Sequence, residues 1–263
     1  MLEYAFAERA LAAALIVGVL CGLLGFFVVL RRLAFIGVGI SHSAIGGVAI
    51  GLVAGIDPRL SATVFSVAVA LGMFTVARGR RVGEDAIIGV FLSGAMALGL
   101  LLTGLQHGYQ KDLFAYLFGS LLAVTASDLA LLGGLATLLV VVIALSFREM
   151  LFVAFDEEVA RAYGRPVDLL DAMLIVMLAL TVVAGVRIVG VLLVEALLVV
   201  PAATAALWTL DFRRQVALSM LLGAGSAAAG LWCSFAFDLA AGASIVLVAV
   251  ATFFGSWMVR RAV

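Results

Sequence analysis

The stretch ALAAALIVGVLCGLLGFFVVL, residues 10–30, contains 21 consecutive residues without a charged side chain. An α-helix needs about 20 predominantly apolar residues to cross the hydrocarbon core of a bilayer. The run is too long for the apolar region of a secretory signal, and no basic leader precedes it. We therefore expect a first membrane-spanning helix that is retained in the protein.

The whole chain has the composition of an integral membrane protein. Of its 263 residues, 66% are hydrophobic and 12% are charged, whereas soluble domains have about 45–50% apolar and about 25% charged residues. The formal net charge is zero, so no overall charge favours nucleic acid as a partner. The two cysteines, Cys21 and Cys233, lie in separate apolar stretches without a CxxC pair, and we expect both to be small core residues.

The same length criterion selects nine spans, which predict an all-α, polytopic helix bundle forming one permease domain over residues 1–263. An additional apolar stretch, residues 113–124, is too short to cross and is expected to form a re-entrant or interfacial helix. Eight spans remain the alternative count. The nine predicted spans are residues 10–30, 34–56, 60–77, 86–105, 129–147, 168–186, 188–207, 216–236 and 241–259.

The basic residues predict the orientation of these spans. With the N-terminus outside, twelve of the sixteen Lys and Arg residues fall on the cytoplasmic side, where loops are enriched in basic residues. A crossing by residues 113–124 would move the basic loop 148–166 outside, so the nine-span arrangement is favoured. It places the C-terminus in the cytoplasm. The four basic residues left outside are Arg9, Arg59, Lys111 and Arg187.

Glycines recur at helical spacing in the first two spans. Gly47, Gly51 and Gly55 lie four residues apart on the second span, and Gly18 and Gly22 do so on the first. Small residues at this spacing let membrane helices approach closely. We predict helix packing at these positions, with the general abundance of glycine in membrane helices as the alternative explanation.

The cytoplasmic loop 148–166 contains the signals of a short helix. Asp156 can cap the start of this helix, and Gly164 can end it. Glu157 and Glu158 fall in its first turn, where the helix dipole favours negative charge. The chain has no GxxxxGK[ST] phosphate-binding motif, so ATP-driven transport would need a separate ATPase subunit. The helix is then either a docking site for that subunit or an ordinary loop helix.

Four stretches together resemble the permease subunits of ATP-binding-cassette importers for zinc, manganese or iron ions. The resemblance runs in order from Arg31 to Trp208. The stretches are RRLAFIGVGISHSAIGGVAIGL (31–52), GEDAIIGVFLSGAMALGL (83–100), LFVAFDEEVARAYGRPV (151–167) and VGVLLVEALLVVPAATAALW (189–208).

The resemblance implies a homodimer of permeases in the cell membrane, two cytoplasmic ATPases and an extracytoplasmic metal-binding protein. The transported ion would be a divalent metal, with zinc favoured over manganese and iron. The chain itself would be no enzyme and would hold no permanent cofactor. The segment that meets the ATPase in related permeases corresponds here to Asp156, Glu157, Glu158, Ala160, Arg161 and Gly164.

The resemblance also singles out His42, near the middle of the second span. Many relatives have an aspartate one turn before this histidine, where the present chain has Val38. Residues four apart share a helix face, so the carboxylate that would accompany the imidazole is missing. We predict that His42 is a metal ligand on the ion path. A hydrogen bond from the imidazole to a carbonyl of a neighbouring helix is the alternative.

Glu195 stands at a position of the seventh span that is usually apolar in relatives. A carboxylate within a span costs at least a few kcal/mol unless it is paired or faces a cavity. We predict that Glu195 is a second metal ligand, with a salt bridge to Arg187 as the alternative. Pro201 cannot donate to the carbonyl of Leu197, which leaves that oxygen available near Glu195.

Two other functional classes fit the sequence less well. A permease for a vitamin or metal chelate, of the B12 or siderophore type, is the main alternative. An intramembrane metalloprotease is excluded by the lack of HExxH and by the presence of two histidines in all. The second histidine, His107, is expected to be an ordinary residue of an outer loop.

Overall fold

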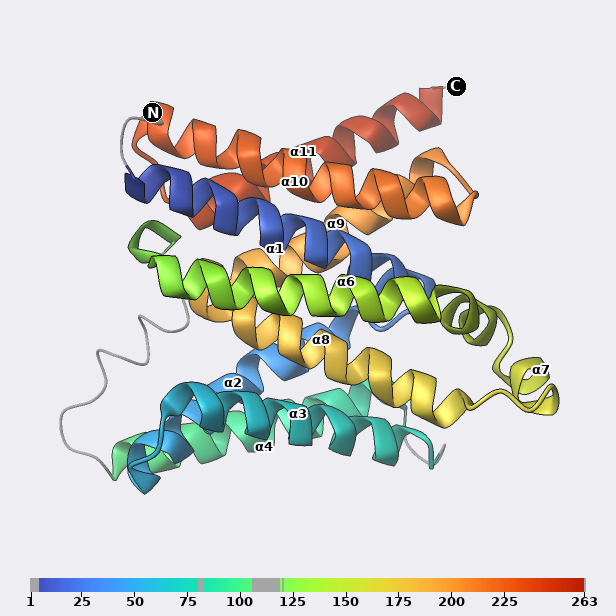
Figure 1. The fold of residues 1–263 in the computed structure, drawn as a ribbon, viewed down its shortest axis with the longest axis horizontal. Helices are drawn as coiled ribbons and strands as arrows, with labels where there is room; N and C mark the ends of the chain where they lie inside the picture. Colours follow the sequence, from blue (N-terminus) through green and yellow to red (C-terminus); the bar gives the residue numbers. More distant parts are fainter. Residues whose placement is uncertain (1–4, 80–82, 106–118, 120, 263) are drawn as a thin grey trace. The chain divides into compact units, whose positions relative to one another are not determined.

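The computed structural model describes residues 5–79, 83–105, 119 and 121–262. Within these residues nine helices are long and apolar enough to cross a membrane, and no strand occurs. The predicted all-α class is therefore confirmed (Figure 1). The nine are α1 (Ala5–Leu30), α2 (Ala34–Ala54), α3 (Pro58–Ala77), α4 (Glu84–Gly104), α6 (Ala126–Phe155), α8 (Val167–Val189), α9 (Val191–Trp208), α10 (Phe212–Phe237) and α11 (Ala241–Ala262).

Each predicted span coincides with one of these helices, but α6 is longer than expected. It has 30 residues, which correspond to about 45 Å and exceed the apolar thickness of a bilayer. Residues 148–155, at the start of the predicted cytoplasmic loop, continue this helix. They contain no glycine, proline or capping residue, and the first helix-capping side chain is Asp156.

The predicted re-entrant helix at residues 113–124 lies largely outside the described residues. Its described part includes a short 3-10 helix, η1 (Leu121–Ala123). His107 also lies outside the described part of the chain.

The described helices belong to two compact units. Unit 1 comprises Met1–Ala34, Phe118–Ala144 and Gly185–Val263, and unit 2 comprises Phe35–Leu117 and Leu145–Ala184. Helices α6 and α8 contribute residues to both. His42 therefore belongs to unit 2 and Glu195 to unit 1.

In unit 1, helix α10 lies along α1, and the backbones of the two helices approach each other closely (Figure 1). A Cβ atom added to Gly18 would lie 2.7 Å from the carbonyl oxygen of Gly223, and one added to Gly22 would lie 2.6 Å from that of Ser219. The Ser219 hydroxyl donates to the Gly22 carbonyl at 2.6 Å. Glycine is thus required here because any side chain would separate the two helices.

In unit 2, helix α2 packs equally closely on α3. A Cβ atom on Gly47 would lie 2.6 Å from the Cα of Ala62, and one on Gly51 would lie 2.8 Å from the Cα of Pro58. These two glycines therefore face the neighbouring helix.

Gly55 differs from the other glycines of its series, because it lies beyond the last residue of α2. Its φ is +69°, and no atom lies within 4 Å of a Cβ built on it. The Ile56 N–H donates to the Gly51 carbonyl at 3.0 Å, which is the hydrogen bond of a glycine-terminated helix. Gly55 ends the helix and packs against nothing.

Candidate functional site

His42 lies in the middle of α2 with a half-buried side chain. Its Nδ1 atom is 3.0 Å from the carbonyl oxygen of Val38 and 3.3 Å from the hydroxyl of Ser41. The Ser41 hydroxyl donates to the same carbonyl at 2.9 Å. One hydrogen bond of the imidazole is therefore made within its own helix.

This contact determines the tautomer of a neutral His42. A carbonyl oxygen can only accept, so Nδ1 bears the proton and Nε2 bears the lone pair. Histidines that bind metals through Nε2 are commonly oriented by such a hydrogen bond from Nδ1 to a backbone carbonyl. Val38 lacks a carboxylate, and its carbonyl oxygen is instead the group that contacts Nδ1 of His42.

Glu195 lies in the second turn of α9 and is half-buried. The helix begins after Gly190, whose φ of +89° separates α9 from α8. The apolar side chains around Glu195 in the sequence, Val194 and Leu197, are buried. A carboxylate within a span is costly unless it is paired or faces a cavity.

Pro201 is buried in the interior of α9. Its missing N–H removes the helical donor to the Leu197 carbonyl. One residue further along, the Leu198 carbonyl is so close to Gly25 of α1 that a Cβ atom on this glycine would overlap it. The turn around Pro201 is therefore a point of backbone contact between α1 and α9 within unit 1.

Among the described residues, no group of three or more His, Cys, Asp or Glu side chains is placed to hold a metal ion. The two residues predicted for the ion path, His42 and Glu195, lie on separate helices, α2 and α9.

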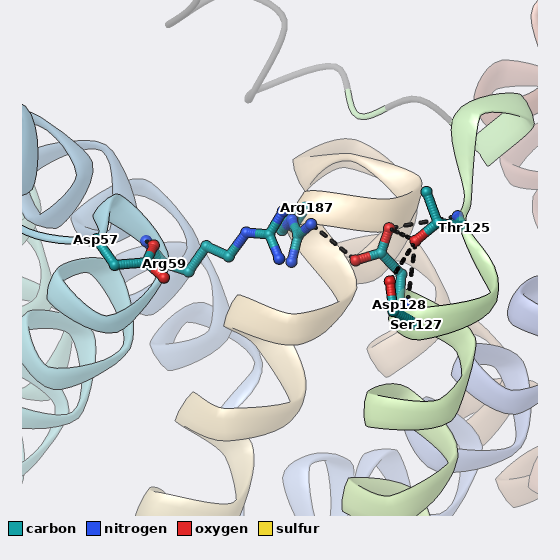
Figure 2. A network of polar contacts seen from close by, with 6 residues as sticks. All are labelled: Asp57, Arg59, Thr125, Ser127, Asp128 and Arg187. Carbon is teal, nitrogen blue, oxygen red and sulfur yellow. Dashed lines mark hydrogen bonds and ion pairs between the residues drawn. The ribbon is translucent and has the colours of Figure 1, made fainter.

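A polar network that the sequence did not predict lies at the start of α6 in unit 1 (Figure 2). The Asp128 carboxylate accepts from the Thr125 hydroxyl at 2.7 Å and from the Thr125 N–H at 3.3 Å, while the Asp128 N–H donates back to that hydroxyl. This is a reciprocal helix cap. Arg187 of α8 donates to the other Asp128 oxygen at 2.8 Å.

The network provides Arg187 with a carboxylate other than Glu195. The two partners are 59 residues apart in the chain, and their side chains are 28% and 13% exposed. In the sequence, the T-x-x-D pattern at residues 125–128 was the one signal for this network. Figure 2 also shows Asp57 of unit 2, which caps α3 by accepting from the Arg59 N–H at 2.8 Å.

The short helix predicted in the cytoplasmic loop is α7 (Glu157–Ala162), which follows α6 (Figure 1). Asp156 is its N-cap and accepts from the Val159 N–H at 2.9 Å. Gly164 follows its end with a φ of +73°. Both predicted helix boundaries are confirmed.

The surface of α7 combines charged and apolar groups. Glu158 is exposed, Glu157 pairs with Arg161 at 3.0 Å, and Ala160 is buried. Three large apolar side chains in and beside α7 are exposed: Phe155, Val159 and Tyr163. Helix α7 and its two ends therefore expose both apolar and charged side chains.

Ion pairs that the sequence did not predict surround α7 in unit 2. Asp168, at the start of α8, pairs with Arg161 of α7 at 2.9 Å and with Arg78 at the end of α3. Arg165 pairs with Glu149 of α6 at 3.0 Å. An acidic residue in the first turn of α8 could be recognised in the sequence, but its partners could not.

Residues 3–260 match the model of the ABC 3 transport family. The chain is 39% identical over 260 residues, 99% of its length and 92% of the relative's, to the uncharacterized membrane protein slr2045 of Synechocystis sp.. It is 38% identical to the manganese transport system membrane protein MntC of Halalkalibacterium halodurans, over 96% of this chain and 87% of that protein.

A solved structure has the same fold. PsaBC from Streptococcus pneumoniae, in complex with Fab, matches with a TM-score of 0.86 and 34% identity, covering 97% of this chain and 92% of that one. The fold is a polytopic helical membrane protein of the transporter class, and the chain belongs to the ABC 3 transport family. The resemblance inferred from four sequence stretches is confirmed, and the chain is a membrane subunit rather than an enzyme.

Proposed function

We propose that this chain is the permease of an importer that moves manganese ions into the cytoplasm, driven by ATP hydrolysis on a separate subunit. The observation that supports manganese is the 38% identity to a manganese transport system membrane protein over 96% of the chain. The family resemblance favoured zinc. One imidazole and one carboxylate do not rank the metals, because an imidazole suits zinc or iron and a carboxylate suits manganese.

His42 and Glu195 are proposed to contact the ion during its passage. Nε2 of His42 supplies one nitrogen lone pair, and the Glu195 carboxylate supplies an oxygen ligand of the kind that Mn²⁺ prefers. A permease must also release its ion, so few and weak ligands suit transport better than a closed site. The ion is cargo, and no permanently bound cofactor is needed for this function.

The partners proposed for the chain are an ATPase on the cytoplasmic side, an extracytoplasmic metal-binding protein and a second copy of the permease. The exposed apolar groups beside α7, together with Glu158, support α7 as the contact for the ATPase. The bilayer covers the lipid-facing sides of the spanning helices.

The proposed function is tested by uptake in cells that lack their own manganese importers. Cells expressing the chain with its ATPase and metal-binding protein should accumulate radioactive manganese, and an excess of unlabelled zinc should inhibit this less than an excess of unlabelled manganese. Equal or stronger inhibition by zinc would assign the permease to zinc. Uptake of a B12- or siderophore-type chelate without free-ion uptake would instead support the alternative class.

The proposed orientation places the N-terminus outside and the C-terminus in the cytoplasm. A matched pair of substitutions tests it, because Leu210 is 90% exposed between α9 and α10 and Leu239 is 56% exposed between α10 and α11. In a background with alanine at Cys21 and Cys233, Leu239→Cys should react with a membrane-impermeant thiol reagent applied to intact cells. Leu210→Cys should react only after the cells are lysed. The reverse labelling pattern would show that the orientation is inverted.

A further inference from the structure

Three elements of unit 2 meet at one carboxylate oxygen. Oδ1 of Asp168, in the first turn of α8, accepts a hydrogen bond from Nη2 of Arg161 in α7 at 2.9 Å. The same oxygen pairs with Nη2 of Arg78, the C-cap residue of α3. Asp168 therefore joins the short helix α7 to the end of α3.

Both guanidinium groups are also held by their own helices. Arg161 donates to Glu157, four residues earlier in the chain, at 3.0 Å. The Arg78 guanidinium lies over the ring of Phe74 in the last turn of α3, 4.8 Å from the ring centroid. A displacement of α7 would therefore move the Arg161 guanidinium at Asp168. The other guanidinium at this carboxylate, that of Arg78, is held by α3.

The ion pairs are too exposed to contribute much to stability. The side chain of Asp168 is 57% exposed, and those of Arg161 and Arg78 are 50% and 32% exposed. Exposed ion pairs are strongly screened by water and add little to the free energy of folding. We therefore expect Asp168 to affect the relative position of α7 and α3.

Helix α3 is packed without intervening side chains on α2, which contains His42. A Cβ atom on Gly47 would lie 2.6 Å from the Cα of Ala62, and the Ser43 hydroxyl donates to that of Ser66 at 3.2 Å. Close-packed backbones transmit a displacement because no side chain can rearrange to absorb it. The end of α3 is thus mechanically connected to the helix of the proposed ion ligand.

We propose that Asp168 is a positioning residue that transmits a displacement of α7 to α3 and, through α3, to α2. This inference rests on the proposed function, because it takes α7 as the contact for the ATPase. It adds a specific connection between that contact and the ion path, made through Asp168 and Arg78, which belong to neither.

The chain offers a matched control in the ion pair of Glu149 with Arg165. Its distance is 3.0 Å, its side chains are 37% and 49% exposed, and it also lies in unit 2. It joins α6 to the segment after α7 and involves no residue of α3. Glu149→Gln removes the same kind of interaction as Asp168→Asn without breaking the connection to α3.

The decisive measurement is hydrogen exchange in the purified complex with its ATPase, with and without bound ATP. In the parental complex, ATP should change exchange both in α7 and at the end of α3. Asp168→Asn should keep the change in α7 and lose it at the end of α3, whereas Glu149→Gln should keep both. A parental response at the end of α3 in Asp168→Asn would overturn the inference.

Transport coupling supplies the second readout. In vesicles, Asp168→Asn should lower manganese uptake per ATP hydrolysed by about fivefold or more, the lower end of typical couplings between sites. Arg78→Gln should have a similar effect, and the double variant should be no worse than either single one, because both break one connection. If the effects of the two single variants multiplied in the double variant, they would not act on one shared connection, and the inference would be contradicted.

Failure of the proposed function would look different. It would appear in the parental complex, as a lack of any ATP response in α7 or a lack of ATP-dependent manganese uptake. Failure of the inference would appear in the Asp168 and Arg78 variants alone, with both parental responses intact.

Discussion

Glu195→Gln is expected to lower manganese uptake at least about tenfold, which corresponds to about 1.4 kcal/mol of lost stabilisation along the transport path. The substitution keeps the shape of the side chain but removes the negative charge that a divalent cation requires. The protein should still insert in the membrane and bind its ATPase, because the side chain is half-buried and isosteric with glutamine. The measurement is initial uptake of radioactive manganese at equal permease levels.

A matched control is Glu8→Gln, which makes the same change at an exposed residue in the first turn of α1. It should transport like the parental protein. His42→Ala should lower uptake to a similar extent as Glu195→Gln, because it removes the proposed Nε2 ligand, whose ring contacts the Val38 carbonyl through Nδ1.

Restoring a carboxylate elsewhere provides the complementary test. Val38→Asp in the Glu195→Gln background should recover part of the uptake, since residues 38 and 42 share a face of α2. If His42→Ala and Glu195→Gln each transport manganese, zinc and iron at the parental level, neither residue lies on the ion path. His42 would then be a helix-packing residue whose imidazole is hydrogen-bonded to the Val38 carbonyl.

Reversing the charges at Glu157 and Glu158 and replacing Gly164 with valine is expected to uncouple the ATPase from the permease. The acidic side chains lie in the first turn of α7, and the valine would have to adopt a φ of +73°, which costs about 1–3 kcal/mol for such a residue. Both changes alter the surface of α7 without touching the spans. Uptake and the amount of ATPase that co-purifies with the permease should both fall by about tenfold or more, equivalent to about 1.4 kcal/mol of binding.

Two control variants separate docking from folding. Glu8→Lys reverses an exposed charge far from α7 in the sequence, and Gly134→Val places the same side chain at a helical glycine where a Cβ atom meets open space. Both should keep uptake and ATPase binding. Parental association and uptake in the triple α7 variant would show that the ATPase docks elsewhere.

The spans could be recognised from the sequence because their signal is local. A run such as residues 10–30 is apolar over the thickness of a bilayer, and each of the nine predicted runs coincides with a helix in the described chain. The caps of α7 were equally readable, since Asp156 and Gly164 act on backbone groups within three residues of themselves.

The candidate residues were only partly determined in this way. His42 was singled out by its residue type and setting, but its tautomer follows from the contact with Val38, which the structure provides. Gly55 matched the packing spacing of Gly47 and Gly51, yet its positive φ makes it a helix end. Spacing alone cannot distinguish a glycine that packs from one that terminates, because both functions use the missing side chain.

The sequence by itself determined the membrane class, the helices and the family, because hydropathy, capping and motifs depend on residues close together in the chain. The tertiary structure alone decided the polar partners: Arg187 with Asp128, 59 residues away, and Asp168 with Arg78. A charged residue can pair with any opposite charge that folding brings within reach, and charges here number 32 in 263 residues, from 16 Lys and Arg and 16 Asp and Glu. Which pairs form depends on how the helices pack, and close backbone contacts such as that of Gly47 with Ala62 set that packing.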